Sequence, residues 1–103
     1  MSIKHLTFDD SAFILYNALT GSYQILLTLS DDCDILFVMN TCDTAVYLNI
    51  PSGAATRKQI RFPAGSSVAL DCRTNSKRIA KGVIQVKYDS APTTGEVTVT
   101  AAR

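Results

Sequence analysis

The chain has 103 residues, of which 47% are hydrophobic and 18% are charged, and its formal net charge is +1. This length gives one domain with a modest core that needs no disulfide or metal to fold. No apolar run approaches the ~18 residues of a membrane-spanning helix, and Met1 does not begin a secretory signal. We therefore expect a single soluble domain, residues 1–103, that is made in the cytosol and has no membrane partner.

Eight short runs of β-forming residues follow one another, and turn residues such as Gly, Pro, Asn, Asp and Ser separate nearly all of them. This spacing predicts an all-β fold: one compact β-sandwich or jelly-roll-like domain of about eight short antiparallel strands. A helix over residues 10–19 is the competing local interpretation. The expected strands are Phe13–Thr20, Tyr23–Leu29, Ile35–Asn40, Ala45–Ile50, Gln59–Phe62, Ser67–Cys72, Val83–Tyr88 and Glu96–Ala102.

The segment before the first expected strand has no clear period. Met1–Asp10 reads as an arm or a short edge strand, and residues 1–11 are the candidate flexible N-terminal arm. The first two strands should form a hairpin around Gly21, because glycine takes a positive φ without strain. Ile25–Leu27 and Ile35–Met39 are continuous apolar runs, which favour strands that are covered on both faces, on one face by the core and on the other by a packed loop or a partner chain.

The charge is unevenly divided along the chain. Residues 1–56 contain one base and six acids (net −5), whereas residues 57–103 contain nine bases and three acids (net +6). Such a division suggests a nucleic-acid face or complementary patches that meet between copies. In a sandwich the two halves interleave, so the division along the sequence need not be a division in space.

Two charged clusters are the candidate contact sites between subunits. The acidic cluster fits no EF-hand pattern and is more simply a turn, in which aspartates bond their own backbone. The basic cluster reads as an exposed loop that is either solvated or in contact with another subunit, and not as a nucleic-acid site, because it lacks the interleaved aromatics that stack on bases. The acidic residues are Asp31, Asp32 and Asp34, and the basic residues are Arg73, Lys77, Arg78 and Lys81.

The sequence contains no arrangement typical of catalysis, of a cofactor or of a metal. His5 has no nucleophile or carboxylate at a recognisable spacing, and no nucleophile elbow or phosphate-binding glycine loop occurs. Cys33, Cys42 and Cys72 are odd in number and fit no zinc pattern, so we expect buried free thiols. We therefore expect a protein that is not an enzyme and binds no cofactor or metal.

The second half of the chain resembles small β-sandwich proteins in the virions of tailed bacteriophages. The resemblance lies in Ala45–Gly53, in Phe62–Asp71 with its Pro-Ala-Gly-Ser turn, in Lys81–Tyr88, and in Ala91–Thr100 with its Ala-Pro-x-x-Gly turn. It implies a virion structural protein, made in the host cytoplasm, that decorates or cements the capsid. The implied partners are the major capsid protein, other virion proteins and further copies of the chain.

Other functions stay open at this point. A neck, tail or fibre module of the virion fits the same resemblance. A carbohydrate-binding module usually exposes aromatic platforms, whereas this chain has no Trp and its four Tyr lie within expected strands. A nucleic-acid-binding barrel would use the basic cluster, but the pI of about 7.7 argues against nucleic acid as a partner.

We expect the acidic cluster of one copy to face the basic cluster of the next. The double change Arg78→Glu and Lys81→Glu should then weaken assembly, because it places like charges opposite each other, and the assembly of the unaltered chain should weaken as salt is added. Light scattering across a salt series measures both effects. Unchanged oligomerisation and unchanged incorporation into virions would contradict this contact.

Overall fold

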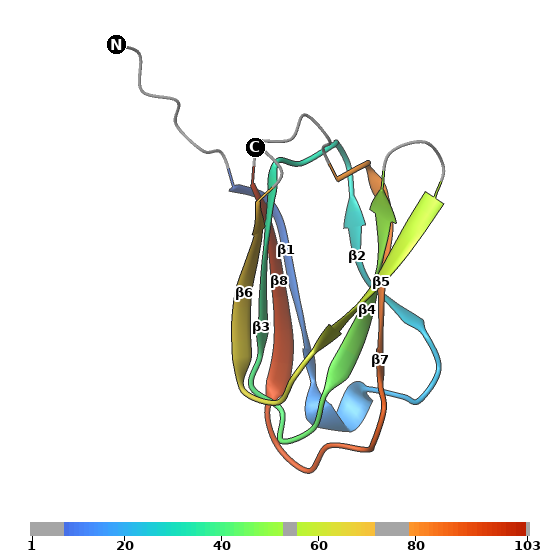
Figure 1. Ribbon diagram of the computed structural model, residues 1–103, viewed down its shortest axis with the longest axis vertical. Coiled ribbons are helices and arrows are strands. Elements are labelled where there is room, and N and C mark those ends of the chain that lie inside the picture. Colours follow the sequence, from blue (N-terminus) through green and yellow to red (C-terminus); the bar gives the residue numbers. More distant parts are fainter. Residues whose placement is uncertain (1–7, 53–55, 72–78, 103) are drawn as a thin grey trace.

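Two four-stranded antiparallel sheets face each other across one core (Figure 1). This computed structural model describes residues 8–52, 56–71 and 79–102. Sheet A has the strand order β1-β8-β3-β6, and sheet B has the order β2-β7-β4-β5. The strands are β1 (Phe8–Leu15), β2 (Gln24–Leu29), β3 (Ile35–Asn40), β4 (Val46–Ser52), β5 (Thr56–Phe62), β6 (Ser66–Asp71), β7 (Gly82–Tyr88) and β8 (Glu96–Ala102).

The strand pairing is nested. β1 pairs with β8, β2 with β7, β3 with β6, and β4 with β5, all antiparallel. Such nesting is that of one long hairpin folded over itself, and the further pairs β3–β8 and β4–β7 join its parts into two sheets. This is the jelly-roll arrangement. The predicted all-β sandwich of eight strands is confirmed, and each sheet combines strands from both halves of the chain.

The predicted hairpin around Gly21 is wrong. β1 ends at Leu15, the 3-10 helix η1 (Tyr16–Ala18) follows, and the chain then crosses to the other sheet. The Gln24 side chain closes this crossing, because its amide accepts a hydrogen bond from the Thr20 N–H (2.9 Å) and donates one to the Ala18 carbonyl (3.1 Å). The turn residues around Gly21 thus connect a strand of sheet A to a strand of sheet B.

The beginning of the chain agrees in part with the edge-strand alternative. β1 starts at Phe8 and is an edge strand of sheet A, so residues 8–11 are strand and not arm, and residues 1–7 lie outside the described residues. Residues 10–15 are strand, so the competing helix over residues 10–19 is wrong as well.

The core lies between the sheets and is filled by alternate residues of their strands. Burying each large aliphatic or aromatic side chain contributes about 1.5–3 kcal/mol. Side chains that are at most 1% exposed include Leu36, Val38, Val46, Leu48, Phe62, Ile84, Val86, Val97 and Val99.

Among the described residues, the continuous apolar runs are not covered on both faces along their whole length, and the expected cover by a partner chain stays a prediction. In β2 the register shifts between Ile25 and Leu27, so a bulge turns Ile25 outward, where it is 63% exposed. In β3, Ile35 is buried, but Met39 on the same outer face is 47% exposed. Only the beginning of β3 is therefore covered on both sides.

The buried amide of Asn40 fastens the end of β3 to the turn between β5 and β6. Its Nδ2 lies 3.1 Å from each of three carbonyl oxygens, those of Thr44, Phe62 and Pro63, and its Oδ1 accepts a hydrogen bond from the Cys42 N–H at 3.0 Å. Asn40 is fully buried, so these bonds offset the cost of removing the amide from water. The two sheets are thereby joined at the lower end of Figure 1.

Gly95, just before β8, packs against the backbone that follows β3. Its φ is +97°, and a Cβ at this position would overlap the backbone of Thr41 and Cys42. The Thr41 N–H donates to the Glu96 carbonyl at 2.9 Å, which fixes this close approach. The position therefore requires glycine for both conformation and space.

Gly95→Ala should destabilise the fold strongly, whereas Gly65→Ala serves as a matched control. Gly65 also has a positive φ (+70°), but a Cβ there meets no atom within 4 Å. The control should cost only the ~1–2 kcal/mol of a left-handed alanine, and Gly95→Ala at least twice as much. Urea unfolding of both variants measures the difference, and equal losses would contradict the packing argument.

Candidate assembly surfaces

The acidic cluster lies between β2 and β3, at the upper end of Figure 1. It meets the C-terminal part of the basic segment within the same chain: Asp32 accepts a hydrogen bond from the Lys81 backbone N–H at 2.8 Å. Cys33 and Ile79 form a β-bridge with bonds of 2.9 and 3.0 Å. The contact of these clusters between copies stays a prediction, because Arg73, Lys77 and Arg78 lie outside the described residues.

The outer face of sheet A carries no charged residue over its central rows. The residues between the buried positions point outward, and the register aligns them in two rows across all four strands. One row consists of Phe13, Thr98, Met39 and Ser67, and the neighbouring row consists of Ser11, Thr100, Phe37 and Ala69. Within the second row, the hydroxyls of Ser11 and Thr100 share a hydrogen bond of 3.2 Å.

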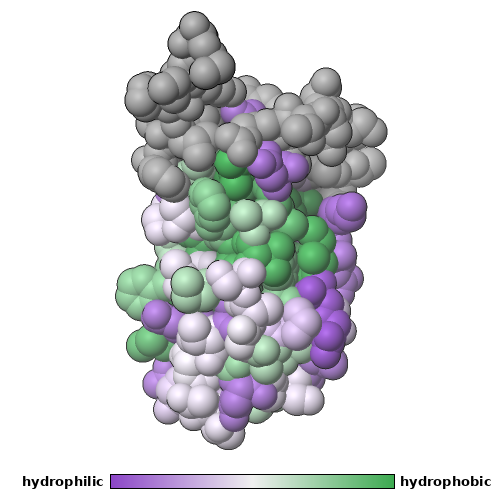
Figure 2. All heavy atoms as spheres, turned by 60° about the vertical axis from the view of Figure 1, so that its left-hand side comes forward, coloured by the Kyte–Doolittle hydropathy of each residue, from purple (hydrophilic) through white to green (hydrophobic). Residues whose placement is uncertain are grey.

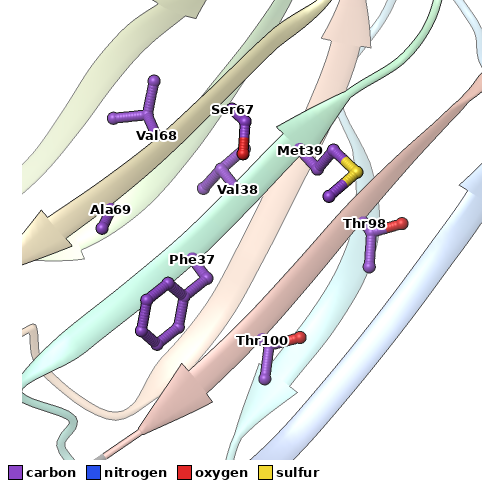
Figure 3. A pocket seen from close by; sticks show the side chains of 8 residues that line it. All are labelled: Phe37, Val38, Met39, Ser67, Val68, Ala69, Thr98 and Thr100. Carbon is purple, nitrogen blue, oxygen red and sulfur yellow. The ribbon is translucent and has the colours of Figure 1, made fainter.

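A shallow groove of about 340 Å³ runs along this face (Figure 3). Phe37 and Met39 of β3 lie at its centre, between the threonines of β8 and the small residues of β6. Figure 2 brings this side of the molecule forward and shows apolar atoms gathered on the face, with weakly polar atoms below them. The full lining is Phe37, Val38, Met39, Ser67, Val68, Ala69, Thr98 and Thr100.

Large apolar side chains are exposed on and beside this groove. Phe13 is 64% exposed, Leu15 is 48% exposed, and Met39 is 47% exposed. Each would gain up to about 1.5–3 kcal/mol if a partner covered it fully. Contiguous exposed apolar surface of this kind is typical of interaction sites.

The outer face of sheet B is mostly polar and cationic, although it also carries the exposed Ile25. The Lys87 Nζ lies 4.9 Å from the ring centre of Tyr23 and 5.6 Å from that of Tyr47, so the lysine is held between two aromatic rings. Burial, and next the proximity of Tyr47, raise the pKa of Tyr23. Beside them, the Asn49 amide donates a hydrogen bond to Gln85 at 3.3 Å. The side chains of this face thus contact one another.

The four edge strands differ in how well they are protected against pairing with another chain. β1 and β2 each contain a register shift, and such bulges bend an edge away from a partner. The sequence of β5 includes three basic residues, which also discourage pairing. β6 has an unbroken register with β3 and no basic residue. It is the edge with neither of these protections.

The described residues contain no group of three His, Cys, Asp or Glu side chains that could hold a metal ion. Cys33 and Cys42 are free thiols that are at most 2% exposed, and burial, followed by Asp43 and Glu96, raises the pKa of the Cys42 thiol. A buried thiol with a raised pKa is a poor nucleophile. The third cysteine, Cys72, lies outside the described residues.

The two turn motifs of the sequence resemblance have local structural roles. In Pro-Ala-Gly-Ser, the Ser66 N–H bonds the Pro63 carbonyl at 3.2 Å, and the turn connects β5 to β6. In Ala-Pro-x-x-Gly, the hydroxyl and N–H of Thr93 both bond the Asp43 carboxylate, and they hold the pKa of that carboxyl below its usual value. Both motifs therefore build connections of the sandwich.

The outer face of sheet A and the unprotected edge were missed by the sequence reasoning. Their residues come from four segments that are far apart in the sequence, so no single motif contains them. The available signal was the alternation of exposed and buried positions in each strand, but it needs the strand order before it defines a surface.

No family model and no curated protein matches this sequence. No helix within residues 8–52, 56–71 and 79–102 is long and apolar enough to cross a membrane. A solved structure from Bacillus, described in the words "Bacillus endospore appendages form a novel family of disulfide-linked pili", is similar, with a TM-score of 0.57. The match covers 98% of this chain and 89% of that one at 17% sequence identity, and at this identity the likeness shows a shared fold.

Proposed function

We propose that the protein is a non-enzymatic structural subunit that packs with further copies, or with other structural proteins, through the outer face of sheet A. The observation that carries this proposal is the uncharged centre of this face, with its groove and its exposed Phe13 and Met39. A partner can cover these central rows without removing any charge from water, so their burial is favourable from the start.

The two sides of the sandwich support a directed assembly. Sheet B presents Lys87 and Arg61 on its outer face, so covering it would require a partner for each cation. Sheet A presents hydroxyl, aromatic and thioether groups, which tolerate close packing. The proposed assembly therefore uses one sheet for contact and leaves the other in water.

In its narrower form, the proposal places the chain in the virion of a tailed bacteriophage, as a capsid decoration or cement protein or as a neck, tail or fibre part. The motif resemblance of the second half of the chain supports this setting. A second setting is a surface appendage, which is supported by the fold shared with the Bacillus endospore appendage protein. Both settings require a small, stable β-sandwich that repeats.

Phe13→Glu and Met39→Glu should each abolish assembly, because each would bury a carboxylate without a partner. Ile25→Glu is the matched control: Ile25 is 63% exposed, about as much as Phe13, but lies on sheet B. Light scattering and negative-stain electron microscopy measure the assemblies. Urea unfolding should show changes below about 1 kcal/mol for all three variants, because the sites are exposed.

Comparing the two variants on sheet A with Ile25→Glu on sheet B tests whether assembly depends on sheet A. If Ile25→Glu disrupts assembly as strongly as Phe13→Glu, the contact does not depend on sheet A. If the unaltered chain stays monomeric alone and also fails to bind particles, the structural function itself is contradicted.

Quantitative mass spectrometry of purified phage particles tests the virion setting. The capsid form predicts a copy number close to that of the major capsid protein, because decoration occupies equivalent lattice sites. A neck, tail or fibre part would instead be present in a few copies. Absence from particles would contradict the virion setting and leave the appendage setting.

A further inference from the structure

We propose that β6 pairs antiparallel with β6 of a second copy, so that two sheets A join into one sheet of eight strands. This inference rests on the proposed structural function and names one contact of the assembly. The partner is a second copy of this chain.

The first step of the argument is that β6 presents an edge open to pairing. All six of its residues pair in register with β3, from Ile35 opposite Asp71 to Asn40 opposite Ser66. Among the described strands, β6 is the last of sheet A, and its only charged residue is Asp71 at the end. A straight edge strand without lysine, proline or bulge is a template for another strand.

The second step identifies the partner strand. A contact between two different edges would bring β6 against a bulged strand, β1 or β2, or against the basic strand β5. Pairing of β6 with β6 of a second copy involves neither a bulged strand nor a basic strand. It is also isologous, so one patch serves both copies, as in most dimers.

The third step fixes the register. Directly opposite residues in an antiparallel pair point to the same face. A two-fold axis through Val68 then places Val68 opposite Val68 of the partner subunit, and Ser67 opposite the partner's Ala69. Asp71 comes opposite the partner's Gly65, so no like charges meet.

This register covers an apolar side chain at the rim of the core. Val68 is opposite Val38 in the layer of sheet A that faces the core, but it is 38% exposed because β6 is the last strand. The partner's Val68 would cover it. The grooves of the two copies would also meet along their β6 walls, which joins the uncharged central rows of the two faces.

Disulfide trapping tests both the pairing and the register. Val68→Cys, in a Cys72→Ser background, places two thiols on the two-fold axis, and in-register Cα atoms about 4.5–5.5 Å apart lie within disulfide range. Mild oxidation should therefore convert most of this variant into a covalent dimer on non-reducing gels. Buried Cys33 and Cys42 should not compete.

Two variants in the same background are the controls. Ser67→Cys lies one residue away on the same strand, but its counterpart would be two residues out of register and beyond disulfide range. Gln59→Cys is exposed on β5, the edge strand of the other sheet at the same side of the sandwich. Both should stay mainly monomeric after the same oxidation.

The outcomes separate this contact from the proposed function. Rapid cross-linking of Val68→Cys alone supports the β6 pair. Val68→Lys should then remove the dimer from light scattering, while the variant still unfolds cooperatively in urea with a modest loss of stability, because Val68 lies at the rim of the core and is 38% exposed. If Val68→Cys does not cross-link, or Ser67→Cys cross-links equally well, the pairing is contradicted. If assemblies sensitive to Phe13→Glu persist in that case, the structural function stands without this contact.

Discussion

The nested pairing of distant strands is the constraint on which the rest of the structure depends. β1 pairs with β8, which is separated from it by most of the sequence. β8 also pairs with β3, and β3 pairs with β6. Each pair aligns alternate residues toward the core, so one arrangement sets the core, both outer faces and all four edges. Forming such pairs closes long loops, and the entropic cost of closure precedes the gain from burying apolar side chains. We therefore expect this chain to fold slowly for its size.

The same arrangement gives the sandwich two unlike sides. Sheet A collects Phe13, Phe37 and Met39 with small and hydroxyl side chains, whereas sheet B collects Lys87 between two tyrosines and a group of carboxamides. Neither side could be assembled from neighbouring segments of the sequence. A structural subunit benefits from this difference, because it determines which surface is covered and which remains in water.

Much of the fold follows from the sequence, and the exceptions have physical causes. The bounds of β3 and β8 match the predicted strands, since turn residues bracket them clearly. The first predicted strand was misplaced because Gly21 indicates a turn, but not whether that turn joins two paired strands or leads from one sheet to the other. The exposure of Ile25 was not predicted, because the bulge in β2 turns its side chain away from the core. The outer face of sheet A was not predicted, because it exists only after four separate segments have been aligned.

The central place of β8 in sheet A also has a consequence for the order of events during synthesis. β8 follows all the other strands in the chain, yet it lies between β1 and β3. A nascent chain that lacks β8 can pair β4 with β5 and β3 with β6, but it cannot complete sheet A. The outer face of sheet A is therefore incomplete until β8 has been synthesised and has paired with β1 and β3. The proposed contact through this face would accordingly form only after β8 is in place.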